Sequence, residues 1–535
     1  YLPTYTFLED VTDQQLSAIL ELNTPGLNVE ASTVREYHTK YAAHILGYLG
    51  GMNDSQWSEY KDQGYTMDAK VGQTGFELAF EEYLHGIDGT RYDEVNKSGA
   101  TTKSYYTKEP VAGNSVETTI DIKIQEVAEK ALDSVMAKIK DPEQNTSTAG
   151  EGLDAEGAAV IVMECQTGKI LACASYPTYN LATMYEDWAE IEADPLKPFF
   201  NRAFGAEYPP GSSFKMCTLI SAMEHRNKSG EFIHPYGTRI EDKGVFTKYE
   251  GFAPTCLAWT SGHFVHTAFD GSPGGIDATD ALCYSCNYFF YVLGDLNNEE
   301  NMSETCKDLG LGVPTGIELV EKTGRLNTAE VKRKIYGSGV NGNFSAGDRI
   351  LGAIGQGEYR FTPLQLCVYA STLANKGTRM KATFLSRVVS SDYRTLIKEN
   401  QPEIANRLEM ASTTIESYWT GMRKVVTQMG GTATAYFGGP KDLYGEGDGV
   451  WPLKDEVLVY AKTGTAQHAS LGSDHGAFIC FAQKKDAAAP DIAIALYGEK
   501  VAHGSWLAPV AEQILLSYYE MDAASEVTAF ENQAG

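Results

Sequence analysis

Residues 208–225 read YPPGSSFKMCTLISAMEH, a rigid turn followed by an apolar run at helical spacing. Pro209, Pro210 and Gly211 make the turn, and the run from Ser212 predicts a helix with Lys215 on the same face. The helix dipole favours developing negative charge at its N-terminus. A neighbouring amine can take the proton of a serine hydroxyl. The pattern suits a nucleophilic serine at Ser212 with Lys215 as its base, although for one such match alone an ordinary helix surface is the favoured interpretation.

One Ser-x-x-Lys match is weak evidence, because Ser58 and Lys61 repeat the spacing without a Gly or Pro before them. A second polar pair stands in ALCYSCNYFFYVLG (281–294), where Ser285 and Asn287 interrupt aromatic and aliphatic residues. Buried polar side chains need partners, so an idle pair there would be costly. The alternative is a local bond to the backbone at a helix start.

A third segment, EVLVYAKTGTAQ (456–467), alternates like a strand and ends in Lys462-Thr463-Gly464-Thr465. A cation beside two hydroxyls suits a carboxylate ligand, and Gly464 leaves room for a close approach. Another Lys-Thr-Gly, at 322–324, follows GIELVE without Thr-Ala-Gln, so we expect a loop there.

The pattern of strands and helices predicts an α+β fold. Hairpins are expected at AAVIVMECQTGKILACASY (158–176) and at HGAFICFAQ with DIAIALYGE (475–499). Helical patterns lie between them, and one before them begins near Asp121, a good cap. Two domains are predicted, at 1–112 and 113–528, with a polar insertion at about 139–157.

The composition argues against some classes of function. The chain has 535 residues, 44 Lys+Arg and 71 Asp+Glu, a net charge of −27. Such a surface repels phosphate backbones, so nucleic acid is not an expected partner. No run of about 18 apolar residues exists, and YLPTYTFLED does not read as a signal peptide. We expect the chain to start within a longer protein, whose N-terminal anchor is absent here.

The cysteines are predicted to be small buried hydrophobes. There are nine, most of them in apolar runs. Cys283 and Cys286 form a C-x-x-C, but no second pair or histidine follows at zinc spacing. We therefore expect no metal site, and nothing in the motifs calls for a cofactor.

Taken together and in this order, Ser-x-x-Lys, Ser-x-Asn and Lys-Thr-Gly are the signature set of penicillin-interacting serine enzymes. The chain resembles the class B penicillin-binding proteins in YPPGSSFK, SCNYFFY, AKTGTAQ and IGQGEYRFTPLQL (354–366). REYHTKYAAHILGYLGG and VGQTGFELAFEEYLHGIDG resemble the non-catalytic pedestal of that class. DHGAFICFAQ (474–483) departs from it, since the family often carries a Trp before the Phe.

The resemblance implies an antiparallel sheet sandwiched by helices, on a mixed N-terminal pedestal or dimerisation-like domain. It implies a peptidoglycan D,D-transpeptidase that acts on stem peptides ending in D-Ala-D-Ala and is acylated by β-lactam antibiotics. The implied location is the outer face of the bacterial cytoplasmic membrane, with a SEDS-family glycan polymerase as a possible partner. The implied catalytic residues are Ser212, Lys215, Ser285, Asn287 and Lys462, and the implied substrate-binding residues are Thr463, Gly464 and Thr465.

Rival interpretations remain. A D,D-carboxypeptidase or serine β-lactamase shares the three motifs, but a compact hydrolase has no need of a pedestal. A catalytically silent scaffold for a glycan polymerase is the alternative from another class, although a decayed site would have lost a motif residue. A bifunctional polymerase would need a glycosyltransferase domain, for which about 110 N-terminal residues are too few.

Overall fold

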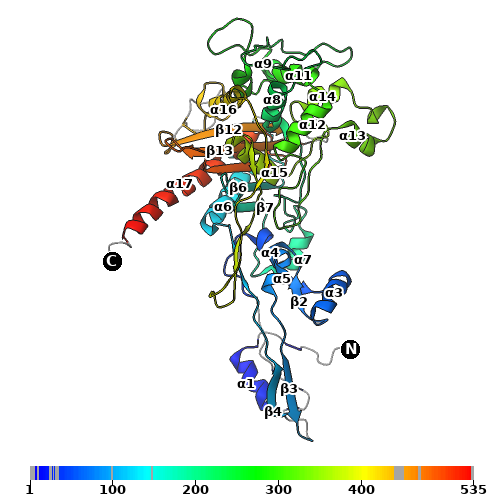
Figure 1. Cartoon of the computed structure of the whole chain (residues 1–535), viewed down its shortest axis with the longest axis vertical. Helices are drawn as coiled ribbons and strands as arrows, with labels where there is room; N and C mark the ends of the chain where they lie inside the picture. The colour runs from blue at the N-terminus through cyan, green and yellow to red at the C-terminus, as the bar shows by residue number, and fades with distance from the viewer. Residues whose placement is uncertain are drawn as a thin grey trace.

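The computed structural model of the chain describes residues 7–8, 11–22, 24, 27, 29, 35–97, 101–145, 147, 149–438, 451–467 and 472–531, with side chains described up to 520. The molecule is long, with a large helix-and-sheet body at one end and a slender N-terminal part at the other (Figure 1). Among the described residues, no helix combines the length and apolar character needed to cross a bilayer.

The body is built on a five-stranded sheet in the order β12-β13-β14-β6-β7. The strands are β6 (Ala158–Glu164), β7 (Ile170–Tyr176), β12 (Val457–Ala466), β13 (His475–Lys484) and β14 (Ile492–Gly498). Every neighbouring pair is antiparallel. Both predicted hairpins are present, and β14 pairs with β6, so the sheet joins the two ends of the domain, as expected for this α+β fold.

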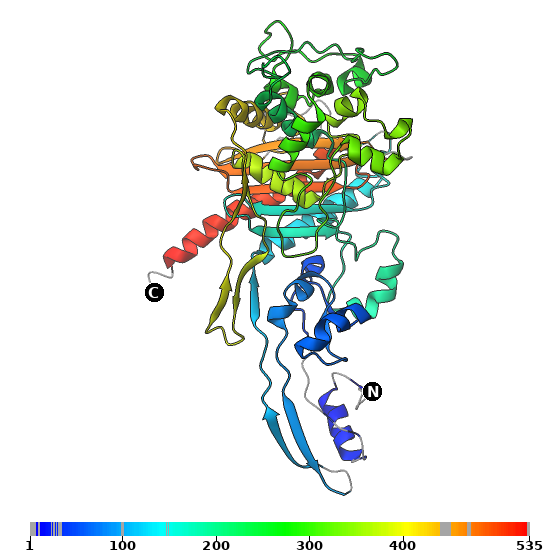
Figure 2. The same cartoon turned by 45° about the vertical axis from the view of Figure 1, so that its right-hand side comes forward.

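Helices cover both faces of this sheet (Figure 2). Alternate strand residues such as Val160 and Val459 pack against α6 (Ile122–Lys140) and α17 (Ala508–Glu531). Their neighbours, such as Ile161 and Tyr460, face α8 (Lys215–Glu224), α11 (Asn287–Leu296) and α15 (Pro363–Ala374). Burial on both faces explains why these antiparallel strands read as continuous apolar runs. The sandwich implied by the sequence is confirmed.

Local signals place several element ends. Asp121 caps α6 by accepting hydrogen bonds from the N–H groups of Lys123 and Ile124. Gly168, at φ 81°, turns the chain between β6 and β7. Thr362 and Gln365 form a capping box at the start of α15. The predicted polar insertion begins slightly later than expected, because α6 continues to Lys140; residues 146 and 148 lie outside the described part of the chain.

The body contains further helices and short strands. They are α7 (Met184–Ala193), α9 (Leu257–Gly262), α10 (Ala278–Cys283), α12 (Glu299–Asp308), α13 (Ala329–Tyr336), α14 (Ala346–Gly352), α16 (Ser412–Thr427), the 3-10 helices η2 (Gly211–Phe214), η3 (Val340–Gly342) and η4 (Gly504–Leu507), and the short strands β8 (Thr378–Met380), β9 (Leu385–Val389), β10 (Leu396–Glu399) and β11 (Ile404–Arg407).

The N-terminal part has little core of its own. It contains α1 (Asp13–Leu22), α2 (Ala43–Leu46), α3 (Asp54–Tyr60), η1 (Lys61–Gln63), α4 (Gly75–Ala79), α5 (Glu81–Leu84), β1 (Leu49–Gly51), β2 (Lys70–Gly72), β3 (Thr90–Val95), β4 (Thr101–Lys108) and β5 (Ser115–Thr118). The β3–β4 hairpin projects away from the body, and every residue of β3 is exposed. Strand β5, in contrast, pairs with β9 of the body.

A small cluster joins this part to the body. Ala43 of α2 packs with Tyr179, Leu181 and Met184, which follow β7 and enter α7. Residues 177–200, which follow β7 in the body, therefore pack against the N-terminal part. The predicted division near residue 112 stays a prediction.

Candidate active site

Ser212 lies in a turn held against the edge of β12. The turn is the 3-10 helix η2, and α8 starts only at Lys215, so the predicted helix begins three residues later than expected. Gly211 has φ 54°, and a Cβ atom there would stand 2.5 Å from the carbonyl oxygen of Thr465. A Cβ on Gly464 would stand 2.8 Å from the carbonyl oxygen of Pro210. Both glycines are required for the serine turn to touch the strand.

Lys215 points from the first turn of α8 to the second motif. Its side chain is fully buried, and Nζ donates to the carbonyl oxygen of Ser285 and to Oδ1 of Asn287, both at 2.7 Å. Nζ also lies 3.2 Å from Ser285 Oγ. Ser285 has φ 56°, in the left-handed region, which is a strained position for a serine and turns its side chain and carbonyl toward this lysine.

Lys462 reaches the same serine from the other side. It is also fully buried, on the face of β12 that looks toward α8. Its Nζ donates to Ser285 Oγ at 2.9 Å and to the Thr463 carbonyl oxygen at 3.0 Å. Ser285 Oγ is thus shared by two lysines from motifs that lie 247 residues apart, the difference between positions 215 and 462. The structure brings the three predicted motifs together.

The pKa values of both lysines are lowered. Burial lowers the pKa of Lys215 to about 8. Burial, followed by repulsion from Lys215, holds the pKa of Lys462 well below its usual range. Two ammonium groups that share one hydroxyl repel each other, and no carboxylate in the described part of the chain bonds to either of them. The pair is therefore expected to titrate as a unit, and to lose its first proton at a lower pH than a free lysine does.

Two residues of the third motif have partners that the sequence did not predict, one at a hydroxyl and one at a backbone carbonyl. Thr463 Oγ1 lies 2.7 Å from Oγ1 of Thr432, in the turn after α16. The Thr465 carbonyl oxygen accepts a hydrogen bond from Gln356 Nε2 at 3.3 Å. Gln356 belongs to the segment IGQGEYRFTPLQL, whose resemblance to the family could have indicated a role at the site. No sequence feature pointed to Thr432. Ser212 is partly exposed, and among the described residues its Oγ makes no hydrogen bond.

The two other motif matches lie in different segments. Ser58 belongs to α3 in the N-terminal part, where its hydroxyl donates to the Asp54 carbonyl oxygen. Lys322, Thr323 and Gly324 are in a loop, as predicted.

Comparison with known proteins assigns the family. Residues 158–516 match the family of the penicillin binding protein transpeptidase domain, and residues 2–118 match the penicillin-binding protein dimerisation domain. The chain belongs to the penicillin-binding protein transpeptidase family. All three motifs lie inside the first matched range.

Relatives agree with this assignment. The peptidoglycan D,D-transpeptidase MrdA of Acinetobacter baumannii is 26% identical over 512 residues, which is 92% of this chain and 66% of that protein. A chain of a peptidoglycan synthase complex that coordinates polymerization and crosslinking has a TM-score of 0.72 at 24% identity, covering 91% of this chain and 76% of that one. PBP2 of Pseudomonas aeruginosa, solved with WCK 5153, has a TM-score of 0.68 at 23% identity, covering 91% and 90%.

A second polar cluster lies directly behind the second motif of this penicillin-binding protein. Asp242, Cys256, His266 and Cys286 each offer one ligand atom, and these atoms all lie within 4.8 Å of one another. His266 Nδ1 is 2.7 Å from Asp242 Oδ2. Two sulfurs, an imidazole and a carboxylate are a donor set that suits tetrahedral Zn²⁺.

The expectation of no metal site rested on the spacing around Cys283 and Cys286. The structure shows why that spacing did not decide the matter: Cys286 meets Asp242, Cys256 and His266, which lie 20 to 44 positions upstream, and Cys283 is not in the cluster. All nine cysteines are buried and free, as predicted.

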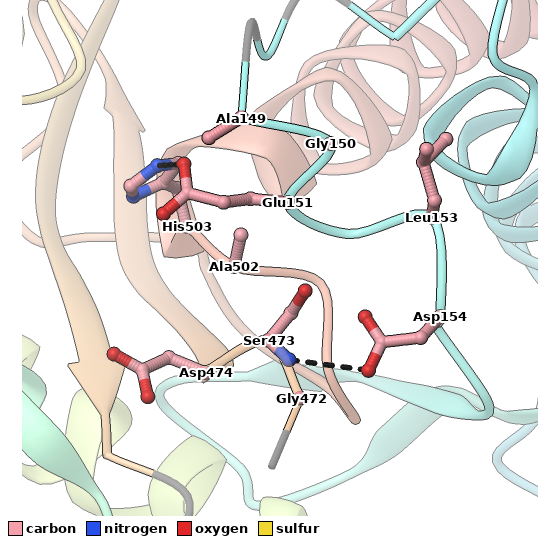
Figure 3. A pocket seen from close by; sticks show the side chains of 10 residues that line it. All are labelled: Ala149, Gly150, Glu151, Leu153, Asp154, Gly472, Ser473, Asp474, Ala502 and His503. Carbon is pink, nitrogen blue, oxygen red and sulfur yellow. Dashed lines mark hydrogen bonds and ion pairs between the residues drawn. The ribbon is translucent and has the colours of Figure 1, made fainter.

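A cavity of about 480 Å³ lies elsewhere, and Figure 3 shows its lining. It is formed by residues of the polar insertion, by Gly472–Asp474 before β13, and by Ala502 and His503 after β14. His503 and Glu151 face each other across it at 3.6 Å. None of the predicted site residues lines this cavity.

Proposed function

We propose that the chain is a serine-type peptidoglycan D,D-transpeptidase that works through a Ser212 acyl-enzyme. The observation that carries the proposal is the convergence of Lys215 and Lys462 on Ser285, beside the turn that bears Ser212. A serine next to a buried network of an amine and a hydroxyl relay supplies the parts that acyl transfer needs. The relatives' names and the family support the same chemistry.

Lys215 is suited to act as the base. A neutral amine has two N–H groups and one lone pair. Its N–H groups point to the carbonyl oxygen of Ser285 and to Asn287 Oδ1, which leaves the lone pair for the proton of Ser212. Ser212 Oγ then attacks the carbonyl between the two terminal D-alanines, and a C–O bond forms.

Ser285 completes the first half of the reaction. Lys215, now protonated, returns its proton through Ser285 Oγ to the nitrogen of the departing D-alanine as the C–N bond breaks. In the second half an amine of a neighbouring strand attacks the ester. Its proton passes back along the same hydroxyl and amine to Ser212 Oγ, which leaves as the new peptide bond forms.

The remaining motif residues hold the substrate. Thr463 and Thr465 bind the terminal carboxylate, next to the positive charge that the lysine pair shares. The N–H groups of Ser212 and Thr465 form the oxyanion hole, since the Gly211 turn and β12 are in contact there. One such donor is worth roughly 3–4 kcal/mol in other acyl-transfer enzymes. Asn287 positions the peptide and Lys215 together.

β-Lactams fit this site because their strained amide and carboxylate imitate the terminal dipeptide. We further propose that the enzyme works at the outer face of the bacterial cytoplasmic membrane with a SEDS-family glycan polymerase. The projecting N-terminal part, which a hydrolase does not need, favours the transpeptidase over a β-lactamase or a D,D-carboxypeptidase. The full set of motif residues disfavours a silent scaffold.

Intact-protein mass spectrometry after incubation with a penicillin tests the proposal. The wild type should gain the mass of one drug molecule, and Ser212→Ala should gain none. Ser58→Ala removes the serine of the other Ser-x-x-Lys and is the matched control, which should be acylated like the wild type. No adduct with intact drug would favour the scaffold, and no adduct with hydrolysed drug would favour a β-lactamase.

A further inference from the structure

We infer that Thr432 is a positioning residue for substrate, which fixes the direction in which the Thr463 hydroxyl donates its hydrogen bond. This inference rests on the proposed function, in which Thr463 binds the carboxylate of the substrate. It concerns a residue outside the three motifs.

The two hydroxyls form an isolated pair. Thr432 Oγ1 and Thr463 Oγ1 are 2.7 Å apart, and either one can be the donor. Thr463 is 9% exposed, so few water molecules reach it. Among the described residues, neither hydroxyl makes another side-chain hydrogen bond. The direction of this single bond is therefore left open in the free enzyme.

Binding of the substrate carboxylate fixes the direction of the hydrogen bond between Thr432 and Thr463. A hydroxyl has one hydrogen to give and can accept two, whereas an ionised carboxylate only accepts. When Thr463 donates to the substrate carboxylate, it can only accept from Thr432, so Thr432 must be the donor of the pair. Hydrogen bonds aligned in this way polarise one another and strengthen the bond to the charged group.

The turn that carries Thr432 is held firmly. Gly431 N–H donates to the Gln428 carbonyl oxygen at 2.8 Å, and Ala433 N–H to the Val425 carbonyl oxygen at 3.1 Å. A Cβ atom on Gly431 would stand 2.5 Å from the Val425 carbonyl oxygen, so the turn closes tightly on the end of α16. Ala433, the next residue after Thr432, is fully buried.

The same helix end also supports the second motif. Cys283 Sγ lies 3.4 Å from the Lys424 carbonyl oxygen, and a Cβ atom on Gly430 would stand 3.0 Å from the Tyr284 ring. Both residues immediately precede Ser285. Thr432 is thus placed on a rigid base that the second and third motifs share, which is what a positioning residue requires.

The experiment compares acylation by a penicillin with acylation by the methyl ester of the same penicillin, which lacks the charged carboxylate. Thr432→Val keeps the shape and removes the hydroxyl. The second-order rate constant for the penicillin should fall about five- to tenfold, the order expected for the loss of one hydrogen bond between neutral groups, and that for the ester should not change. Thr432→Ser should restore the rate.

A second comparison does not depend on the ester. In a Thr463→Val background, Thr432→Val should have no further effect, because the hydroxyl it orients is gone. Thr427→Val, an exposed threonine of α16 whose hydroxyl bonds to the Arg423 carbonyl oxygen, is the control and should react like the wild type. Thermal unfolding of each variant shows whether it is folded. If Thr432→Val does not fold, Thr432→Ala is used instead.

The outcomes separate the two proposals. An equal loss with penicillin and ester, a further loss in the Thr463→Val background, or no loss at all would overturn the role of Thr432. If the proposed function itself were wrong, the wild type would form no serine adduct with the penicillin, which is a different result from any of these.

Discussion

Ser285 is the residue on which the site depends, because its hydroxyl is the meeting point of two buried lysines. No carboxylate side chain bonds to either lysine among the described residues, although acidic residues outnumber basic ones 71 to 44 in the whole chain. A carboxylate there would raise both pKa values and keep both amines charged. Because neither lysine has a carboxylate partner there, one of the two amines can be neutral.

The acylation rate should therefore rise with pH. The pKa of Lys215 is lowered to about 8, and that of Lys462 lies well below its usual range. Below these values both amines carry protons and neither can accept the proton of Ser212; above them the lone pair of Lys215 is free. The rate constant for acylation should climb roughly tenfold per pH unit on the acid side and level off above about pH 8.

Stopped acylation reactions analysed by mass spectrometry across this range would show the profile. The unfolding temperature at each pH is the control that separates titration of the site from loss of structure. A flat profile would mean that Lys215 is neutral throughout, or that another group is the base.

At the scale of single elements, α16 is the support that links the second motif to the third. Lys424 Nζ donates to Asp280 Oδ1 at 2.6 Å and to Thr279 Oγ1 at 2.7 Å, both on α10. The Asp280 side chain is 4% exposed. Helix α10 ends at Cys283, two residues before Ser285. The ion pair thus holds the approach to the second motif.

Lys424→Met should be strongly destabilising, because it leaves the buried charge of Asp280 without a partner. Breaking one side of such a buried pair costs about 3–5 kcal/mol. Urea unfolding followed by circular dichroism measures the loss. Arg387→Met breaks the exposed pair with Glu117 and is the matched control, which should change stability much less. Equal losses for the two variants would contradict the argument.

Sequence patterns predicted the strand of the third motif, the helix after Ser212 and helix α6, because apolar spacing and caps such as Asp121 leave local signals. They did not predict the start of α8 at Lys215, since a 3-10 turn and a first helical turn read alike. Thr432 and the cluster around Cys286 were also missed. Both depend on contacts between segments far apart in the chain, which no spacing within one segment reveals.

At the scale of the whole molecule, the N-terminal part is attached to the body in several places: β5 pairs with β9, Phe76 packs on Phe384, and α2 is hydrogen-bonded to the body. Ala42 N–H donates to Glu129 of α6 at 2.6 Å. Burial lowers the pKa of His44 to about 4, so the ring is neutral, and its Nε2–H donates to the Pro198 carbonyl oxygen at 2.6 Å. The Tyr179 ring packs edge-on against His44 at 5.1 Å between centroids. Residues 42–44 are thus held by three separate segments of the body.

Tyr179→Ala should loosen this junction and leave the serine site intact. Tyr179 is 8% exposed and also packs on Phe199, so its loss leaves a cavity worth about 3 kcal/mol. Because the hairpin and α1 bury almost nothing of their own, the N-terminal part should then unfold in a separate, earlier calorimetric transition. Acylation of Ser212 should keep its wild-type rate, since the lysine network makes no contact with the junction. Tyr92→Ala, on the exposed hairpin, should alter neither measurement. A slower acylation with an unchanged unfolding profile would instead mean that the junction acts on the site, and that the two parts of the molecule are coupled rather than merely joined.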